Sequence, residues 1–298
     1  MNQVWFGDNL PILKQLPDSS FSLIYIDPPF NTGKERNYTR LRTIPDESGD
    51  RVGFKGKRYR TIRVGSQSYA DYFDDFMEFL EPRLREAHRL LTSNGTFYFH
   101  IDYREVHYCK ILLDHIFGRE CFLNEVIWAY DYGGRTKRKW PPKHDNILVY
   151  VKNPDDYIFN VEAIDRIPYM APGLVGPEKA ARGKLPTDVW WHTIVPTNSK
   201  ERTGYPTQKP LGILRRIVKA SSNPGETVLD FFAGSGTTGE AAHENGRSFV
   251  LVDSNPEALE IMVKRLSKCK AEFINYDLTP HVAHPQELSL FDYQASQR

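Results

Sequence analysis

Four residues, Asp27-Pro28-Pro29-Phe30, directly follow an apolar run over residues 21–26. The run predicts a buried strand, so the four residues form the turn at its end. Proline lacks an N–H donor and fixes φ, which makes the turn rigid and keeps its carbonyl groups pointing one way. A carboxylate, carbonyl acceptors and an aromatic ring in this arrangement are suited to holding a planar base by its amino group.

A second motif, residues 229–239, is typical of a strand, a glycine turn and the start of a helix. Glycines let the backbone approach a ligand, and a helix N-terminus offers free N–H groups. Asp253 ends the next predicted strand, where a carboxylate can bind ribose hydroxyls. Alone, the motif fits a dinucleotide cofactor, S-adenosylmethionine or a purely structural turn. Asp230 favours S-adenosylmethionine, because a carboxylate attracts a sulfonium and an amino group but repels a pyrophosphate.

The 298 residues suffice for one large α/β domain or a core domain with an appendage. Every apolar run is too short to span a bilayer, and the N-terminus lacks the basic region and the cleavage site of a secretion signal. Three scattered cysteines, Cys109, Cys121 and Cys269, indicate a reducing cytoplasm and no zinc site. The pair His100 and Asp102 is only a partial ligand set, so no metal is predicted. We expect a cytoplasmic protein with no membrane association.

The net charge of +1 hides two basic runs. Residues 34–63 contain ten Lys/Arg against four Asp/Glu, and residues 135–143 contain five Lys/Arg, no acid and Trp140. Each run alone is compatible with a solvated loop. Two such runs on glycine-rich, aromatic-containing segments favour a polyanionic partner.

Apolar periodicity predicts strands that alternate with helices, which indicates a mostly parallel sheet covered on both faces. Predicted strands cover residues 4–6, 21–26, 96–101, 125–130, 146–151, 227–232 and 248–253. Predicted helices cover residues 10–16, 69–91, 104–117, 210–221, 237–245 and 256–267. Residues 31–68 have no clear period and are expected to form a long functional or mobile loop. Residues 153–204 are irregular and proline-rich, and the last thirty residues are expected to be partly disordered.

The motifs together resemble the amino-methyltransferases that act on DNA, in the β arrangement, where the Asp-Pro-Pro-aromatic motif precedes the cofactor loop. The resemblance covers roughly residues 3–266. It is carried, in the family's order, by Gly7-Asp8-Asn9-Leu10, Asp27-Pro28-Pro29-Phe30-Asn31-Thr32-Gly33, Tyr205-Pro206-Thr207-Gln208-Lys209-Pro210 and Asp230-Phe231-Phe232-Ala233-Gly234-Ser235-Gly236-Thr237-Thr238. The family usually has Pro in place of Phe231 and often His in place of Tyr205.

The resemblance implies an α/β fold with a Rossmann-like, seven-stranded, mostly parallel sheet and one reversed strand, the fold of S-adenosylmethionine-dependent methyltransferases with a circularly permuted motif order. Residues 1–152 would form the catalytic half, including the mobile basic loop 31–68. Residues 153–204 would recognise the target sequence, residues 205–270 would form the cofactor-binding half, and residues 271–298 a tail.

The resemblance also assigns the site. The catalytic residues would be Asp27, Pro28, Pro29 and Phe30. The S-adenosyl-L-methionine site would comprise Asp8, Asn9, Thr207, Gln208, Lys209, Asp230, Phe231, Phe232, Ala233, Gly234, Ser235, Gly236, Thr237, Thr238 and Asp253. Simpler roles remain open for several of these: a helix cap for Asp8, Asp27 or Asp253, a core ring for Phe30 and a surface position for Lys209.

The expected reaction is methylation of the N6 amine of adenine in a specific double-stranded DNA sequence, by base flipping and direct transfer. Asp27 and the Pro28 carbonyl would accept the two amine hydrogens, and Phe30 would stack on the base. Asp at position 27, in place of Ser, favours adenine within the family. The alternatives are the N4 amine of cytosine, a DNA-binding relative without activity and a nicotinamide dehydrogenase. A homodimer and a cognate restriction endonuclease are the expected partners besides DNA.

Overall fold

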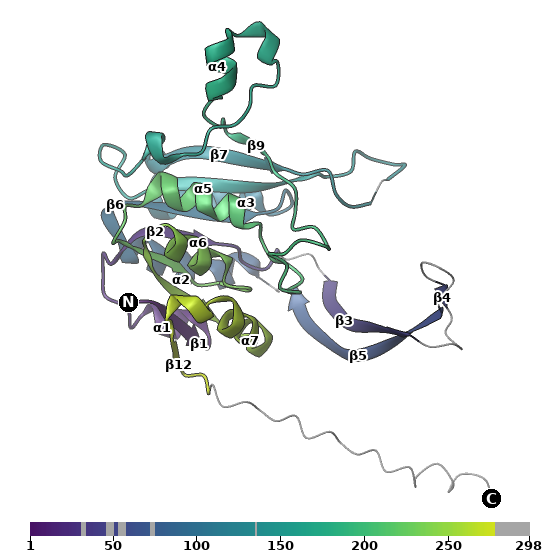
Figure 1. Ribbon diagram of the computed structural model, residues 1–298. Helices are drawn as coiled ribbons and strands as arrows, with labels where there is room; N and C mark the ends of the chain where they lie inside the picture. Colours follow the sequence, from purple (N-terminus) through teal and green to yellow (C-terminus); the bar gives the residue numbers. More distant parts are fainter. Residues whose placement is uncertain (31–33, 46–50, 53–57, 72–74, 135, 278–298) are drawn as a thin grey trace, which may run out of the picture.

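The computed structural model describes residues 1–30, 34–45, 51–52, 58–71, 75–134 and 136–277, and its central element is a nine-stranded sheet of order β12-β1-β11-β10-β2-β6-β8-β7-β9 (Figure 1). The strands are β1 (Gln3–Phe6), β2 (Phe21–Ile26), β6 (Leu91–Ile101), β7 (Phe122–Ala129), β8 (His144–Val151), β9 (Val189–Trp191), β10 (Thr227–Asp230), β11 (Ser248–Asp253) and β12 (Glu272–Ile274). Only β8 runs against its neighbours β6 and β7. The α/β fold with one reversed strand is therefore confirmed.

The sheet has two strands more than the expected seven, because β9 and β12 extend its two edges. β12 pairs with β1 in parallel, with Gln3 opposite Glu272. The expectation of a tail after residue 270 is therefore wrong for Glu272–Ile274. A three-residue strand is too short to show a period, and its partner lies at the other end of the chain. Residues 278–298 lie outside the described part of the chain.

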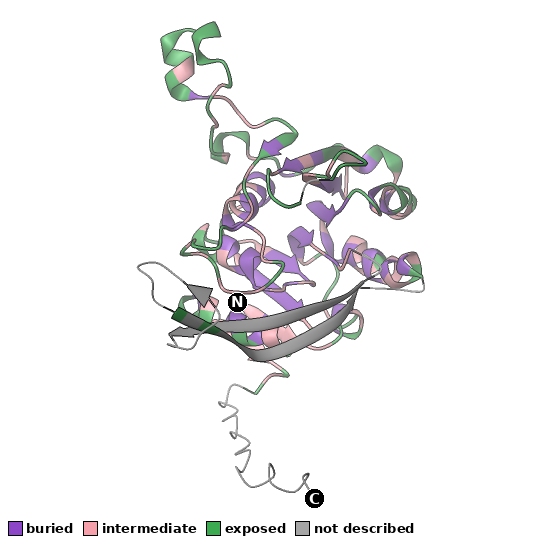
Figure 2. Ribbon diagram, turned by 90° about the vertical axis from the view of Figure 1, so that its right-hand side faces the viewer, coloured by how far each residue is buried: buried purple, intermediate pink, exposed green. Residues whose placement is uncertain are grey.

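Helices cover both faces of the sheet, so successive residues of a central strand enter different cores. In β2, Ile24 and Ile26 pack into one core with α1 (Asn9–Leu13), α2 (Phe76–Leu90) and α3 (Val106–Phe117). Leu23 and Tyr25 pack into the other core with α5 (Leu211–Ser221), α6 (Thr237–Glu244) and α7 (Pro256–Arg265). Figure 2 shows this buried interior as a continuous region of the sheet and its helices. Burial on both faces explains why β2 is apolar at every position rather than alternating.

Local signals fix where most helices begin and end. Asp75 caps α2, since its Oδ1 accepts the Glu78 N–H at 2.9 Å. The helix therefore begins at Phe76 and not at residue 69 as the apolar period predicted. Residues 69–71 belong instead to β5 (Arg58–Asp71). Gly118, with φ of 93°, ends α3 in a conformation that favours glycine.

The expectation of a loop over residues 31–68 is wrong for the described part of that segment. β3 (Lys34–Pro45) and β5 pair antiparallel, and β4 (Arg51–Val52) joins β5 to make a three-stranded sheet. Figure 1 shows this hairpin extending away from the nine-stranded sheet. The segment lacks an apolar alternation because it is not built into the main sheet, so its strands left no signal in the hydrophobic pattern.

Residues 153–204 are mostly irregular, as expected. They contain the short helices η3 (Val161–Ala163), η4 (Pro172–Leu174) and α4 (Pro177–Arg182) before β9. Ile167 and Lys184 exchange two backbone hydrogen bonds of 2.8 Å, which close the base of a protrusion. Figure 1 shows α4 at the tip of this protrusion, beyond the β7–β9 edge of the sheet. The remaining short helices are η2 (Arg119–Cys121) and η5 (Ser267–Cys269).

Three further expectations concern the described residues only. No helix there combines the length and the apolar character needed to cross a bilayer. No group of three His, Cys, Asp or Glu side chains there is arranged to hold a metal ion. Cys109, Cys121 and Cys269 are buried free thiols.

Gly239 lies where α6 packs closely against the sheet, so a substitution there measures how tight this packing is. A Cβ at this position would lie 2.7 Å from Leu251 Cδ1 and 3.3 Å from Phe249 Cδ2, both in the fully buried core. We expect Gly239→Ala to lower the free energy of unfolding by about 1–2 kcal/mol, because overpacking outweighs the gain in helix propensity. Urea denaturation would measure this change. Gly173→Ala is the matched control, since nothing lies within 4 Å of its Cβ, and an equal loss there would contradict the packing argument.

Candidate active site

Adjacent parallel strands bring carboxylates together at one edge of the sheet. β1, β11, β10, β2 and β6 are neighbours that run in the same direction, so their carboxyl ends meet. Ligands of open α/β sheets bind at this edge. A cavity of about 830 Å³ lies there, and its lining takes one aspartate from the end of each strand in turn: Asp8, Asp253, Asp230, Asp27 and Asp102.

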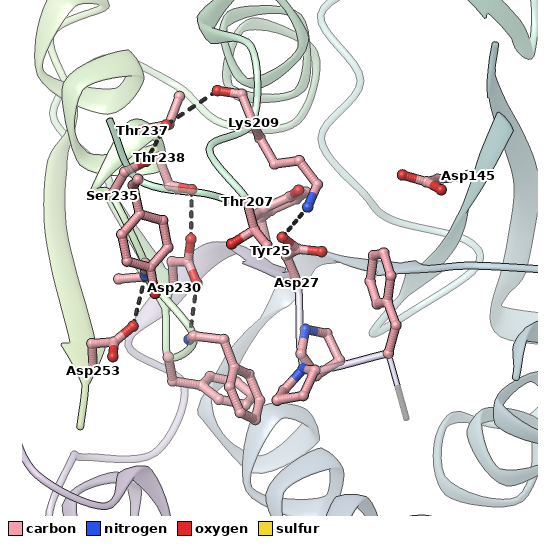
Figure 3. A pocket seen from close by; sticks show the side chains of 18 of the residues that line it. Tyr25, Asp27, Asp145, Thr207, Lys209, Asp230, Ser235, Thr237, Thr238 and Asp253 are labelled. Carbon is pink, nitrogen blue, oxygen red and sulfur yellow. Dashed lines mark hydrogen bonds and ion pairs between the residues drawn. The ribbon is translucent and has the colours of Figure 1, made fainter. Parts of the chain in front are cut away.

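The turn after β2 points its functional groups into this cavity (Figure 3). Asp27 Oδ2 forms an ion pair with Lys209 Nζ, and Asp27 Oδ1 lies 3.9 Å from His100 Nδ1. Lys209 Nζ is also 5.2 Å from the centre of the Phe30 ring. Phe30 is half-buried and packs partly against the core, so it is both a core ring and a cavity wall. Among the described contacts Asp27 caps no helix, whereas Lys209 is tied to the predicted catalytic turn.

Asp230 is buried at the centre of the site, with 2% of its surface exposed. Its Oδ1 accepts the Phe232 N–H at 3.0 Å and its Oδ2 accepts the Thr238 hydroxyl at 2.6 Å. Burial raises the pKa of Asp230 to about 7, against the opposing effect of these two hydrogen bonds, and the negative charges of Asp27 and Asp253 add to the rise.

Asp253 and the glycine loop hold each other in place. The Gly234 N–H donates to Asp253 Oδ2 at 2.7 Å, and the Asn255 N–H donates to Asp253 Oδ1 at 2.8 Å. The cap of α7 is Asn255, so Asp253 does not cap that helix. Gly234 has φ of 50°, and a Cβ there would come within 3.0 Å of the Tyr205 ring. Burial raises the pKa of Asp253, which like Asp230 is partnered by hydrogen bonds rather than by an ion pair within the described residues.

Two predicted cofactor residues do not line the cavity. Gly236, with φ of 73°, lies at the N-cap of α6. A Cβ at this position would lie 2.7 Å from Met262 Cγ, so the absence of a side chain leaves room for Met262. Gln208 Oε1 accepts the Thr203 N–H at 2.8 Å, and its Nε2 donates to the Glu201 carbonyl at 2.7 Å, which braces the loop before α5. The other predicted positions that line the cavity are Asp8, Asn9, Thr207, Lys209, Asp230, Phe231, Phe232, Ala233, Gly234, Ser235, Thr237, Thr238 and Asp253.

Asn9 ties the early Asp8-Asn9 pair to the glycine loop, and Arg83, which the sequence did not single out, links the two side chains of the pair. Asp8 caps α1 through the Leu10 N–H at 3.1 Å and also pairs with Arg83 at 2.9 Å, while its side chain stays 60% exposed. Arg83 Nε donates to Asn9 Oδ1 at 2.6 Å, and Asn9 Nδ2 donates to the Phe231 carbonyl at 2.7 Å. Asp8 is therefore a helix cap and a cavity residue at once.

The charge distribution suits a ligand with a positive centre. Asp27, Asp230 and Asp253 face one cavity, and of these three only Asp27 has an ion-pair partner among the described residues, Lys209. Since a pyrophosphate would place negative charge beside Asp230, a dinucleotide fits this site poorly. A sulfonium and an amino group fit its carboxylates, and two hydroxyls fit Asp253.

Comparisons with known proteins agree with this chemistry. The family model for N6 and N4 methyltransferases, described as DNA methylase, matches residues 21–264. The type II methyltransferase M.HpaI of Haemophilus parainfluenzae is 31% identical over 89% of this chain and 73% of its own length. The DNA adenine methyltransferase YhdJ of Escherichia coli (strain K12) is 30% identical over 87% of this chain and 81% of its own.

The chain belongs to the N6/N4 DNA methylase family. The crystal structure of the M1.HpyAVI–SAM complex has a similar fold, with a TM-score of 0.55, 21% identity, and coverage of 89% of this chain and 99% of that one. The resemblance drawn from the four motifs is thus confirmed at the level of family and fold.

This methylase also has a buried polar network behind the cavity, which the sequence motifs missed. His100 Nδ1 lies 2.8 Å from the Tyr25 hydroxyl, and His100 Nε2 lies 3.2 Å from Asp145 Oδ2. Asp145 Oδ1 accepts the Tyr130 hydroxyl at 3.0 Å. Burial alone would raise the pKa of Asp145, but the hydrogen bond and charge of His100 hold it below its usual value. The available signal was His100, a polar residue between Phe99 and Ile101 in the apolar strand β6, whereas Asp145 lies in the polar start of β8 and gave no such signal.

The buried Asp230 predicts an unusual dependence of stability on pH. Its folded pKa of about 7 lies above the ordinary aspartate value near ~4, so the folded state retains the proton between these two values. The folded state then binds more protons than the unfolded state, and this group's contribution to stability falls as pH rises from about 4 to about 7.

We expect Asp230→Asn to remove this contribution. Relative to wild type, the variant should gain unfolding free energy as pH rises through that window and keep a constant difference above it, as measured by urea denaturation at a series of pH values. Asp155→Asn, at an exposed loop position, is the control. A difference between Asp230→Asn and wild type that does not vary with pH would contradict the assignment.

Proposed function

We propose that this methylase uses S-adenosylmethionine to methylate the N6 amine of adenine in a specific sequence of double-stranded DNA. The observation that carries the proposal is the shared cavity of two motifs that lie about 200 residues apart in sequence. The Asp27–Phe30 turn and the glycine loop after Asp230 open into it. Lys209 connects them, because its Nζ pairs with Asp27 and its carbonyl accepts the Thr237 hydroxyl at 3.3 Å.

The cofactor residues fit S-adenosylmethionine by their chemistry. Bound there, the cofactor would supply an electrophilic methyl group. Asp230 would attract its positively charged amino acid end, and Asp253 would accept the ribose hydroxyls, as the loop N–H groups already hold this carboxylate in position. Asp8, exposed at the far side of the cavity, would face the adenine end. The name of the M1.HpyAVI–SAM complex supports the same cofactor.

The amine would be held by the turn after β2. An exocyclic amine is a weak nucleophile because its lone pair is delocalised into the ring. Lys209 occupies Asp27 Oδ2, which leaves Oδ1 and the Pro28 carbonyl to accept the two N–H bonds. Acceptance of both hydrogens localises the lone pair on nitrogen and directs it, so catalysis is mainly alignment. Phe30 would stack on the base, which is worth about 1–3 kcal/mol for base–aromatic contacts.

Adenine is preferred over cytosine on two grounds. Asp rather than Ser precedes the two prolines, and the similar YhdJ is named an adenine methyltransferase. The family also includes N4 methyltransferases, and the same two acceptors suit the cytosine amine. Mass spectrometry of nucleosides from DNA incubated with the protein and S-adenosylmethionine separates the two. N6-methyladenine is the expected product, N4-methylcytosine alone would replace adenine in the proposal, and no methylated base would favour a DNA-binding relative without activity.

Target recognition is proposed for residues 153–204. This segment follows β8 and exposes the apolar side chains of Met170, Leu174 and Trp191, with 89%, 88% and 70% of their surfaces accessible. Exposed apolar side chains on a protrusion favour contact with another molecule. The homodimer and the cognate restriction endonuclease stay predictions, and the type II relatives support the second.

Asp27→Asn tests the role of the carboxylate. We expect kcat to fall by about 10²–10³, as for the removal of one aligned polar group in other enzymes. Asparagine has a single acceptor oxygen, which Lys209 attracts, so an N–H donor replaces the acceptor that would face the amine. The affinity for S-adenosylmethionine, measured by calorimetry, should change by no more than about fivefold, which corresponds to one hydrogen bond of about 1 kcal/mol. Glu260→Gln, at an exposed position on α7, serves as the surface control. Undiminished methylation by Asp27→Asn would overturn the mechanism.

A further inference from the structure

The loop between β7 and β8 combines an exposed aromatic ring with a concentration of positive charge. Trp140 has 95% of its surface exposed, more than any other large apolar side chain in the described residues. Single exposed apolar residues are common on protein surfaces and need no explanation alone. The surroundings of Trp140 decide its interpretation.

Those surroundings are basic. Trp140 lines an open hollow of about 840 Å³ together with four cationic side chains, Lys137, Arg138, Lys139 and Lys143, and a single acid, Asp131. None of the first three forms an ion pair with an acid among the described contacts, although Lys139 Nζ lies 6.0 Å from the Tyr103 ring. An aromatic ring among unpaired cations fits a nucleic acid, which offers both phosphates and base faces.

The loop has a defined shape. Lys143 Nζ donates to the carbonyls of Tyr132 at 2.7 Å and Gly133 at 2.8 Å, which joins the two arms of the loop at its base. At its tip the Thr136 hydroxyl donates to the Lys139 carbonyl and accepts the Lys139 N–H at 3.3 Å. These contacts lower the conformational entropy that the loop loses when it binds a partner.

The loop also lies at the mouth of the catalytic cavity. Pro142 and His144, which end the loop, line that cavity, and so does Tyr103, the ring beside Lys139. Figure 1 shows the loop extending past the ends of β7 and β8. A duplex that delivers a base into the cavity therefore passes close to Trp140, which is two residues from Pro142.

We propose that residues 131–134 and 136–143 form a DNA-binding arm. Lys137, Arg138 and Lys139 bind phosphates next to the flipped nucleotide, and Trp140 stacks on a base that loses its neighbour when the target leaves the helix. Inserted side chains of this kind stabilise unstacked steps in other DNA-binding proteins. This inference rests on the proposed function, which supplies DNA as the substrate. The contact between the loop and DNA can be measured as binding, independently of methyl transfer.

The first experiment tests the stacking. Fluorescence anisotropy would compare binding to two labelled duplexes, one intact and one in which an abasic analogue leaves its neighbours unstacked. We expect wild type to prefer the abasic duplex, and Trp140→Ala to weaken binding to it about tenfold, in the range of base–aromatic stacking. Trp140→Phe should stay within about threefold of wild type, because a ring is retained. Tyr108→Ala, which removes an exposed ring on α3, is the control and should bind as wild type does.

The second experiment tests the phosphate contacts. Replacing Lys137, Arg138 and Lys139 together by Ala should reduce the slope of log affinity against log salt by about 2–3, since each lost phosphate contact removes about 0.9. The control replaces Lys14, Lys264 and Lys268, three exposed lysines elsewhere on the chain, and removes the same charge. Equal changes in slope for the two triple variants would assign the effect to net charge and overturn the arm.

The inference and the proposed function fail in different ways. If wild type methylates DNA but Trp140→Ala binds the abasic duplex as tightly as wild type does, the arm is wrong and the proposed function stands. If wild type methylates no DNA but its binding depends on Trp140 and on the three cations, the proposed function is wrong and the arm stands.

Discussion

The parallel pairing of five neighbouring strands is the constraint on which the site depends. β1, β11, β10, β2 and β6 run in one direction, so the aspartates that follow or end them all meet at one edge. No single segment of the chain could assemble this cavity, because its neighbours in space are distant in sequence. The reversed strand β8 completes the arrangement, since it brings Asp145 at its beginning to the same edge where β6 ends. The buried strands and helices thus serve mainly to align strand ends.

Negative charges brought together in a cavity repel one another, and this repulsion is reduced in three ways. Asp27 is neutralised by Lys209, and Asp8 by Arg83. Asp253 is held by N–H groups of the glycine loop and of the turn before α7. Asp230 has only neutral donors among the described residues, and its raised pKa reflects the cost of keeping that charge buried. A ligand with a positive centre would lower this cost, so the buried charge of Asp230 would be stabilised by binding such a ligand.

The sequence predicted what is local. Most strands and helices lie within a few residues of their predicted bounds, because apolar period, caps and glycines act over short distances. The catalytic turn and the glycine loop are contiguous motifs, and both line the cavity. What failed was non-local. The β3–β5 hairpin has no apolar alternation, and β12 exists only through its pairing with β1. Arg83, His100 and Asp145 reach the site through helix and strand packing that no spacing in the sequence encodes.

The cavity and the basic loop carry opposite charges, and a single DNA substrate is suited to both. The cavity gathers carboxylates that would repel a phosphate, whereas the loop at its mouth gathers lysines and an arginine that attract one. If the loop binds DNA as proposed, a polynucleotide strand would be held at the mouth and repelled inside the cavity, so the neutral base would enter rather than the backbone. A base that enters the cavity would first leave the stack of its neighbours. The exposed ring of Trp140 at the mouth could then stack on the neighbouring bases in place of the base that left. Under the proposed function, the division of charge between cavity and loop would favour a flipped base whatever sequence surrounds it.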